Sequence, residues 1–245
     1  MARIFCVANQ KGGVGKTTTA QNLAACLAMA DCPTLLVDLD PQCNATTGCG
    51  AEPHQQHPLV KNSPIRESLV ETGVDQLRLL PGCRSLHDLD VLSRGEYAAT
   101  LRSYLQEELT DFEYAMIDCP PSLGPFTQAA LESADEVLMP IQCEYFAMEG
   151  LTQMIRVIRD IREQPHHRLE FAGIALTMYD ETLELTEEVE TEVRDFFGDI
   201  VFDTVIPRDV AVSEAPSFGR SVLDHAPRSR GARAYIELAM EVLER

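Results

Sequence analysis

The sequence predicts an α/β fold in which one doubly wound, mostly parallel sheet carries helices on both faces. Short apolar runs alternate with amphipathic stretches of helical length, which is the pattern of strands joined by crossover helices. Most of these runs are apolar throughout, as expected for strands buried on both faces of a parallel sheet. At 245 residues the chain has the size of one α/β domain, which we expect to span residues 1–245.

The first third of the chain supplies the elements that open the sheet. Residues 4–8 (Ile-Phe-Cys-Val-Ala) predict the first strand, and residues 16–30 have the amphipathic pattern of the first helix. Residues 34–38 and 76–80 are further apolar runs of strand length. Between them, residues 50–64 are rich in His, Gln and Pro and predict a surface loop.

The middle and last thirds continue the alternation. Further strands are expected at residues 114–118, 136–141, 171–177 and 200–205. Further helices are expected at residues 97–109, 124–133, 148–164, 183–197 and 232–243. In sheets of this kind, ligands bind beyond the carboxyl ends of the strands.

The charge of the chain limits its partners. A net charge of −19 repels nucleic acid over the surface as a whole, so DNA binding requires a local basic patch. No apolar run approaches the length that spans a bilayer, and no basic-then-apolar leader precedes the first strand, which predicts a cytoplasmic protein. The C-terminus has no Lys-rich amphipathic extension, which argues against membrane anchoring.

The cysteines are scattered and contain no C-x-x-C pair. Several lie within apolar elements, where a reduced thiol behaves as a small hydrophobic group. We therefore expect reduced structural thiols and no zinc site, and an iron–sulfur site shared across a dimer is a minor alternative. The cysteines are Cys6, Cys26, Cys32, Cys43, Cys49, Cys83, Cys119 and Cys143.

A glycine-rich segment joins the first strand to the first helix. It nearly matches G-x-x-x-x-G-K-[ST], except that Gln10 stands at the first glycine position. Its glycines let backbone N–H groups close around phosphate oxygens, and the helix directs its positive end at the anion. Lys16 supplies a charge to the β/γ-phosphates, and the Thr17 hydroxyl is a Mg²⁺ ligand. The expected phosphate-binding residues are Gly12, Gly13, Val14, Gly15, Lys16, Thr17 and Thr18, whereas Lys11 taken alone could equally be a solvated loop charge.

The position of Lys11 makes the match specific. The segment from Lys11 to Thr18 resembles the deviant Walker A motif of the ParA/MinD group of P-loop ATPases. This resemblance implies that Lys11 reaches across an ATP-bound homodimer to the phosphates in the other subunit. There it would act like an arginine finger, neutralising charge on the transferring phosphoryl group.

Two predicted strands end in an aspartate at the edge that carries the glycine-rich segment. The strand at 34–38 ends at Asp38 and continues into Asp38-Leu39-Asp40-Pro41-Gln42, and the strand at 114–118 ends at Asp118. An aspartate there holds Mg²⁺-bound water or orients an attacking water, whereas a lone one would be a turn or cap residue. The resemblance implies that Asp40 serves hydrolysis and that Asp118 is the Walker B aspartate, with both near the Mg²⁺. No Glu or His stands out as a general base, which suits slow turnover.

Motifs in the C-terminal third also resemble ParA/Soj proteins, so the resemblance covers essentially the whole chain. It implies that Met178, Pro207 and Asp209 border the adenine. Relatives commonly have Asn where this chain has Asp209. An aspartate can accept a hydrogen bond from the adenine amino group but cannot donate one to the base. The motifs are Thr177-Met178-Tyr179-Asp180, Val205-Ile206-Pro207-Arg208, Ser213-Glu214-Ala215-Pro216-Ser217 and Ala226-Pro227-Arg228-Ser229-Arg230-Gly231-Ala232.

The same region has a local surplus of arginine. In ParA/Soj-like proteins basic residues here bind DNA without sequence preference, which implies this role for Arg208, Arg228, Arg230 and Arg233. A dimer would double such a patch and make binding salt-dependent. Alternatively, these arginines pair with neighbouring acids or cap the last helix.

Residues 181–199 are strongly acidic, with Val189, Val193 and Phe196 on one helical face. This segment is either a solvated helix with one buried stripe or a site that recruits a basic partner peptide. The sequence alone does not separate the two interpretations.

The leading hypothesis is a partitioning ATPase for chromosomes or plasmids: its ATP-bound dimer coats nucleoid DNA, and a ParB-like partner stimulates hydrolysis. One alternative positions a protein cargo, such as a chemoreceptor array, flagellum or microcompartment. A second is a metabolic or iron–sulfur P-loop enzyme, related to the nitrogenase iron protein or dethiobiotin synthetase. A third, disfavoured by the C-terminus, is a MinD-like membrane cycler.

Overall fold

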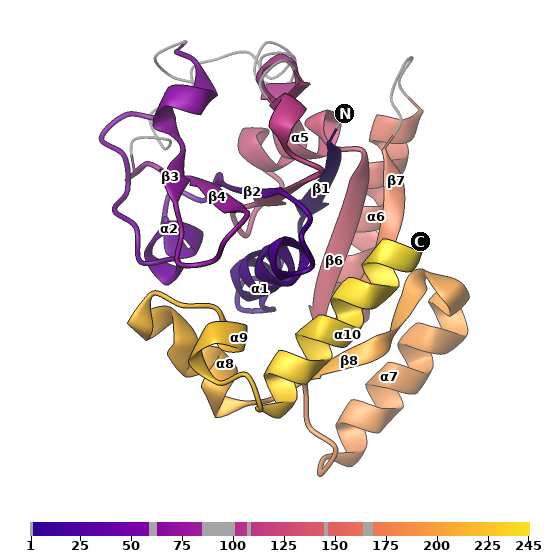
Figure 1. Ribbon diagram of the computed structural model, residues 1–245. Coiled ribbons are helices and arrows are strands. Elements are labelled where there is room, and N and C mark those ends of the chain that lie inside the picture. The colour runs from indigo at the N-terminus through magenta and orange to yellow at the C-terminus, as the bar shows by residue number, and fades with distance from the viewer. Residues whose placement is uncertain (1, 59–62, 85–100, 107–108, 145–146, 164–168) are drawn as a thin grey trace.

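A computed structural model describes residues 2–245, apart from 59–62, 85–100, 107–108, 145–146 and 164–168. The described strands form a single eight-stranded sheet in the order β3-β4-β2-β5-β1-β6-β7-β8 (Figure 1). Only β3 runs antiparallel to its neighbour, so the expected mostly parallel sheet is confirmed. The strands are β1 (Arg3–Val7), β2 (Thr34–Asp38), β3 (Val70–Glu71), β4 (Leu77–Leu80), β5 (Tyr114–Asp118), β6 (Glu136–Gln142), β7 (Glu170–Tyr179) and β8 (Val201–Pro207).

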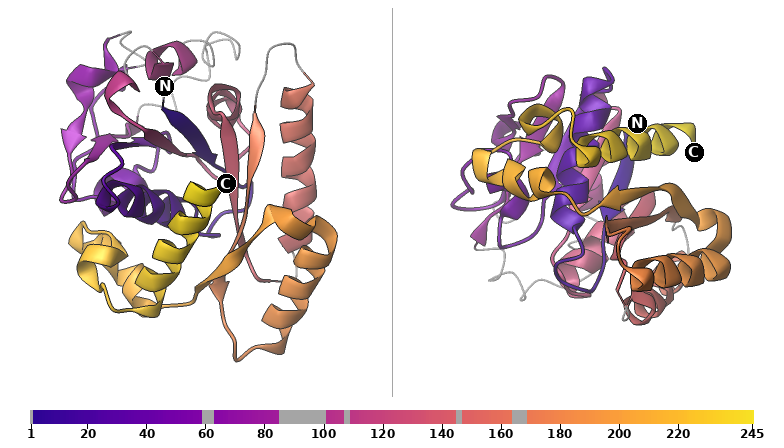
Figure 2. Two further views of the ribbon diagram at one scale, coloured as in Figure 1. Left: turned by 45° about the vertical axis from the view of Figure 1, so that its right-hand side comes forward. Right: turned by 90° about the horizontal axis from the view of Figure 1, so that it is seen from below.

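Helices cover both faces of the sheet, with α1 and α10 on one side and α6 and α7 on the other (Figure 2). Alternate residues of β1 enter the two cores: Ile4 and Cys6 lie in one, and Phe5 and Val7 lie in the other. Double burial of this kind explains why the strands are apolar throughout. The helices are α1 (Lys16–Met29), α2 (Asn44–Gly48), α5 (Pro125–Ser133), α6 (Ala147–Arg162), α7 (Glu184–Phe197), α8 (Val210–Glu214), α9 (Val222–His225) and α10 (Arg230–Glu244).

The expected elements match the structure to within a few residues, with local differences. The two-residue strand β3 and the short helices α2, α8 and α9 are not predicted by periodicity, because elements so short show no repeat. Helix α10 begins two residues earlier than expected, at Arg230, because the Ser229 hydroxyl caps it by accepting from the Ala232 N–H at 3.1 Å.

Two expected segments differ in other ways. Of the helix expected at 97–109, residues 101–106 are helical, and residues 97–100 and 107–108 lie outside the described part. The described residues of 50–64 are mostly loop, but His57 is fully buried. His54 also forms an isolated parallel bridge to Cys83, so this loop packs partly against the body of the protein.

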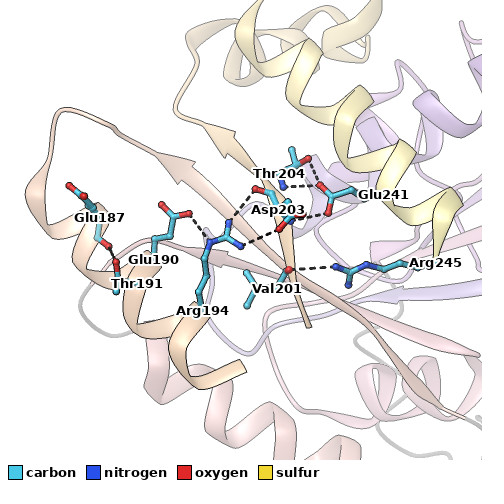
Figure 3. Close-up of polar contacts among 9 residues, drawn as sticks. All are labelled: Glu187, Glu190, Thr191, Arg194, Val201, Asp203, Thr204, Glu241 and Arg245. Carbon is cyan, nitrogen blue, oxygen red and sulfur yellow. Dashed lines mark hydrogen bonds and ion pairs between the residues drawn. The ribbon is translucent and has the colours of Figure 1, made fainter. Parts of the chain in front are cut away.

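The β8 edge of the sheet is held by side chains from two helices (Figure 3). Glu241 of α10 accepts hydrogen bonds from the backbone N–H groups of Asp203 and Thr204, at 2.9 and 2.7 Å. Arg194 of α7 donates to the Asp203 carbonyl at 3.2 Å. These bonds satisfy backbone groups where the β7–β8 register shifts, and they fix α10 and α7 to the sheet. In the part of the chain that the structure describes, no helix is long and apolar enough to cross a bilayer.

Candidate nucleotide-binding site

The glycine-rich segment lies at the carboxyl end of β1, in the middle of the sheet. Gly15 precedes α1 with a left-handed φ of 86°, and Gly13 has a φ of 77°. A side chain at either position would be strained, so both glycines serve the turn that exposes backbone N–H groups. The loop therefore has the backbone geometry that the predicted phosphate site requires, next to the N-terminus of α1.

Thr177 of β7 fixes the orientation of this loop. Its buried hydroxyl lies 2.8 Å from the Val14 carbonyl oxygen and 3.0 Å from that of Ile141, and it shares its proton between them. Because the peptide group is planar and trans, holding the Val14 carbonyl directs the Gly15 N–H the opposite way. This role is not predicted from the sequence, because the bond joins residues 163 positions apart.

Lys16 lies inside the loop and is 6% exposed. Its Nζ donates to the Lys11 carbonyl oxygen at 2.9 Å. Burial lowers the pKa of the Lys16 ammonium, and the neighbouring Asp118 opposes that shift. A buried cation at the opening of α1 provides the charge that a β/γ-phosphate requires.

Asp118 ends β5 and is fully buried. Neither carboxylate oxygen has a hydrogen-bond partner among the described residues. Burial raises its pKa well above the ordinary value and nearby Asp38 raises it further, whereas the charge of Lys16 lowers it. An unpaired buried carboxylate is costly unless a cation compensates it, and oxygen ligands of this kind suit Mg²⁺. Asp118 and Thr17 therefore fit a Mg²⁺ site.

Asp38 and Asp40 belong to a second buried network beside Asp118. The β2–β5 register pairs Asp38 with Asp118. The Thr46 N–H and hydroxyl both donate to Asp38, at 2.8 and 2.6 Å. Burial raises the pKa of Asp38 to about 6, and the bonds from Thr46 oppose that shift.

Asp40 accepts from the Gln42 N–H at 2.9 Å, and its own N–H donates to Asp38 at 3.1 Å. It is 5% exposed and lies two residues beyond the end of β2. Asp38 thus orients the turn that carries Asp40. This positioning role of Asp38 is not predicted from the sequence.

Lys11 is held at the rim of the loop. Its backbone N–H donates to Asn9 Oδ1 at 3.0 Å, and Asn9 Nδ2 donates to the Pro140 carbonyl at 2.8 Å. Its ammonium lies 3.0 Å from Glu144 Oε2 in an ion pair whose side chains are 33% and 48% exposed. An exposed pair of this kind is weak, so the Lys11 ammonium is free to exchange partners.

The residues expected near the adenine lie at the ends of β7 and β8. Met178 has a left-handed φ of 52°, and Pro207 ends β8 beside Tyr179. The Asp209 carboxylate accepts from the Ala211 N–H and from the Gly231 N–H, both at 2.9 Å. It therefore joins the first turns of α8 and α10.

Three of the four arginines expected to bind DNA come together. Arg208, Arg230 and Arg233 line a groove of about 410 Å³, whose other side chains include Asp180, Glu181 and Glu237. Arg230 forms an ion pair with Glu181 at 2.8 Å. For this arginine, the structure shows the pairing with an acid that the alternative interpretation expects.

Arg228 lies in the turn before α10 and does not line that groove. The basic patch is therefore smaller than the sequence suggests, and acidic side chains interrupt it.

Comparison with known proteins identifies the family. A family model described as an AAA domain matches residues 2–171. The chain is 46% identical over 245 residues to the chromosome-partitioning ATPase Soj of Thermus thermophilus, with 99% of this chain and 96% of the relative covered. It is 43% identical over 255 residues to the chromosome partitioning protein ParA of Caulobacter vibrioides, with 99% and 94% covered. The chain belongs to the ParA/Soj family of P-loop ATPases.

A solved structure with a bound nucleotide has the same fold as this chain. Cobyrinic acid a,c-diamide synthase from Mycobacterium smegmatis, crystallised with ADP and magnesium, has a TM-score of 0.85 and 32% sequence identity to this chain. The match covers 100% of this chain and 95% of that one.

Proposed function

We propose that this protein is an ATP-switched dimeric ATPase for chromosome or plasmid partitioning. The observation that carries this proposal is the position of Lys11. Its ammonium is at the rim of the loop and paired only with exposed Glu144 among the described residues, while Lys16 occupies the interior. The two lysines thus have separate roles: Lys16 serves the phosphates of its own subunit, and Lys11 serves those of a second subunit.

The residues of the site divide the reaction between them. Backbone N–H groups of Gly12, Gly13 and Gly15 bind the phosphates. Thr17 and Asp118 would hold Mg²⁺, which would neutralise charge on the phosphate oxygens. Asp40, oriented by Asp38, positions the attacking water. With no strong general base in this arrangement, hydrolysis is slow until a ParB-like partner stimulates it.

The DNA-binding step rests on the arginines of the C-terminal third. A groove of mixed charge in one protomer binds DNA weakly, but a dimer presents two copies of it. ATP then controls DNA binding through dimerisation, and hydrolysis releases the protein. Met178, Pro207 and Asp209 border the adenine in this proposal, and the two capping bonds of Asp209 fix its carboxylate as an acceptor there.

The test is ATP-dependent binding to nonspecific DNA across a salt series. We expect binding with ATP and Mg²⁺ that weakens steeply with salt, and a shallower salt dependence for the Arg228→Ala/Arg230→Ala variant. Lys16→Ala should abolish binding with ATP. Binding that is independent of nucleotide, or unchanged in Lys16→Ala, would overturn the proposal.

The likeness to the Mycobacterium smegmatis synthase supports a second candidate, an ATP-dependent metabolic enzyme. An enzyme of that kind uses the same phosphate loop without binding DNA. Absence of ATP-dependent DNA binding, together with normal ATP binding, would favour this candidate or a ParA-like positioning ATPase with a protein cargo.

A further inference from the structure

Two amide side chains are buried on helix α1, just beyond the phosphate loop. Gln21 and Asn22 are each 2% exposed. A buried amide is costly unless its polar atoms are hydrogen-bonded, so each side chain needs specific partners. Those partners connect the nucleotide site with the segment Gly219–Val222, which leads into α9.

Asn22 bridges the first turn of α1 and the start of α9. Its Nδ2 donates to the Thr18 carbonyl at 2.8 Å, and its Oδ1 accepts from the Val222 N–H at 2.7 Å. Because a carbonyl can only accept and a backbone N–H can only donate, these two partners fix the direction of the amide. Val222 begins α9, and its N–H has no acceptor within that helix, so Asn22 supplies one from 200 residues away.

Gln21 joins the same segment to α2. Its Nε2 donates to the Gly48 carbonyl at the end of α2 and to the Arg220 carbonyl at 3.3 Å. Beside these bonds, Gly50 and Gly219 have left-handed φ values of 74° and 65°, and their backbones are in contact. A Cβ at Gly219 would lie 2.7 Å from the Gly50 Cα, so this approach requires glycine.

The segment Gly219–Val222 is therefore held from two sides of the nucleotide site. On one side, the Asn22 amide ties it to Thr18 of the phosphate loop. On the other, it is tied through α2 to Asp38, which accepts two hydrogen bonds from that helix and pairs in register with Asp118. Further along the chain, the segment leads through α9 to the arginines at the start of α10 (Figure 1).

We propose that Asn22 and Gln21 are positioning residues that transmit occupancy of the phosphate loop to the segment Gly219–Val222. Phosphate oxygens attract the N–H groups of the loop and of the first turn of α1, which orders the turn that carries Thr18. The Asn22 amide passes this order to the N-terminus of α9, and Gln21 keeps α2 aligned with the same segment. Nucleotide thereby reduces local opening of the segment that leads to the arginines.

The inference rests on the proposed function only for nucleotide binding by the loop, because neither dimerisation nor DNA binding enters it. MgADP is therefore the probe. It fills the loop but lacks the transferring phosphoryl group on which Lys11 of a second subunit acts in the proposed function.

The test is hydrogen–deuterium exchange of the full chain, with and without saturating MgADP, measured by mass spectrometry on fragments that cover residues 219–226. In the wild type we expect MgADP to slow exchange there at least about fivefold, since coupling between two sites usually amounts to about 5- to 150-fold. Residues 151–162 of α6, on the opposite face of the sheet from α1 (Figure 2), should not respond and serve as the internal reference. A wild type that binds MgADP without a response at residues 219–226 would overturn the proposal.

Two variants remove the bridge from opposite ends. Asn22→Ala removes the amide, and Val222→Pro removes only the N–H that it accepts from. Proline is favoured at the first position of a helix, and Ser221, with a φ of −70° and a ψ of 159°, has the backbone that precedes a proline. We expect each variant to lose the response to MgADP at residues 223–226. If both act through one bond, the double variant loses no more than either single variant.

Glu241→Ala is the matched control. It removes a similar link between a side chain and a distant backbone, from α10 to the Asp203 and Thr204 N–H groups of β8. We expect residues 219–226 to respond to MgADP in this variant as in the wild type. A response that is kept in Asn22→Ala, or lost equally in Glu241→Ala, would show that the amide only supports the fold and would overturn the proposal.

Titration with a fluorescent ADP analogue separates this inference from the proposed function. A wild type that does not bind the analogue would contradict the nucleotide site itself, and the transmission with it. Binding in every variant, with the exchange response lost only in Asn22→Ala and Val222→Pro, is the result that the proposal predicts.

Discussion

The Lys11 ammonium lies 3.0 Å from Glu144 Oε2, across 133 residues of sequence. The pair joins the rim of the phosphate loop to the segment that follows β6. Because both side chains are partly exposed, the pair contributes little to stability, and its main effect is to occupy Lys11. In the proposed mechanism, Lys11 must leave Glu144 before it reaches the phosphates of a second subunit.

We predict that Glu144→Gln promotes ATP-dependent dimerisation. Removing the competing carboxylate frees Lys11, so the dimer should form at about two- to fivefold lower protein concentration, as expected for an exposed ion pair. Sedimentation velocity with MgATP measures this shift. Glu163→Gln, which removes the acid of an exposed pair with Arg159, is the matched control. A weaker dimer in Glu144→Gln would show that this carboxylate assists Lys11.

We predict that Thr177→Val weakens ATP binding about tenfold, because a lost hydrogen bond releases the Val14 carbonyl. Thr177→Ser keeps the hydroxyl and should restore most of the affinity. Titration with a fluorescent ATP analogue measures both. Thr152→Val makes the same chemical change at an exposed position on α6 and should leave the affinity unchanged. Equal loss in the Val and Ser variants would assign Thr177 a packing role only.

We predict that Asp118→Asn stabilises the nucleotide-free protein increasingly as pH rises. The raised pKa of Asp118 means that the folded state retains this proton more tightly than the unfolded state does. Below about pH 4 the Asp118 carboxyl is protonated in both the folded and the unfolded state, and its burial carries no penalty for charge. At higher pH the unfolded state loses this proton first, so the free energy of unfolding of the wild type falls. Asn resembles the protonated form, so the difference in Tm between the variant and the wild type should grow from about pH 4 to pH 7.

Thermal unfolding at a series of pH values measures this difference, with Asp160→Asn at an exposed position as the control. Asp38, whose pKa is about 6, interacts with Asp118, so its altered titration in the variant contributes to the difference in Tm. In the Asp118→Asn variant, Mg²⁺ should no longer increase the affinity for ATP. A Tm difference that does not vary with pH would contradict the buried, unpaired state of this carboxylate.

The sheet and the phosphate loop were predictable because their signals are local. Apolar runs of strand length alternate with helical periodicity, and Gly13 and Gly15 occur directly before the lysine and the helix. Asp118 was predictable for the same reason, since an aspartate that ends a buried strand faces the ligand edge.

Contacts between distant residues were not predictable from these patterns. Thr177 contacts Val14 across 163 residues, and nothing in the sequence near either position indicates the bond. Asp209 shows a related limit: resemblance suggests an adenine contact, whereas the structure adds two capping bonds that depend on where α10 begins. The bond from Arg194 of α7 to the Asp203 carbonyl likewise depends on how the helix packs and not on a local pattern.

The central claim, that ATP switches the protein to a dimer through Lys11, is tested most directly by the molar mass in solution. Light scattering coupled to size exclusion, with MgATP, compares Asp40→Ala with Lys11→Ala/Asp40→Ala, so that hydrolysis does not deplete the ATP-bound state. We predict a dimer for Asp40→Ala and a monomer that still binds ATP for the double variant. A dimer of equal stability in the double variant would contradict the account.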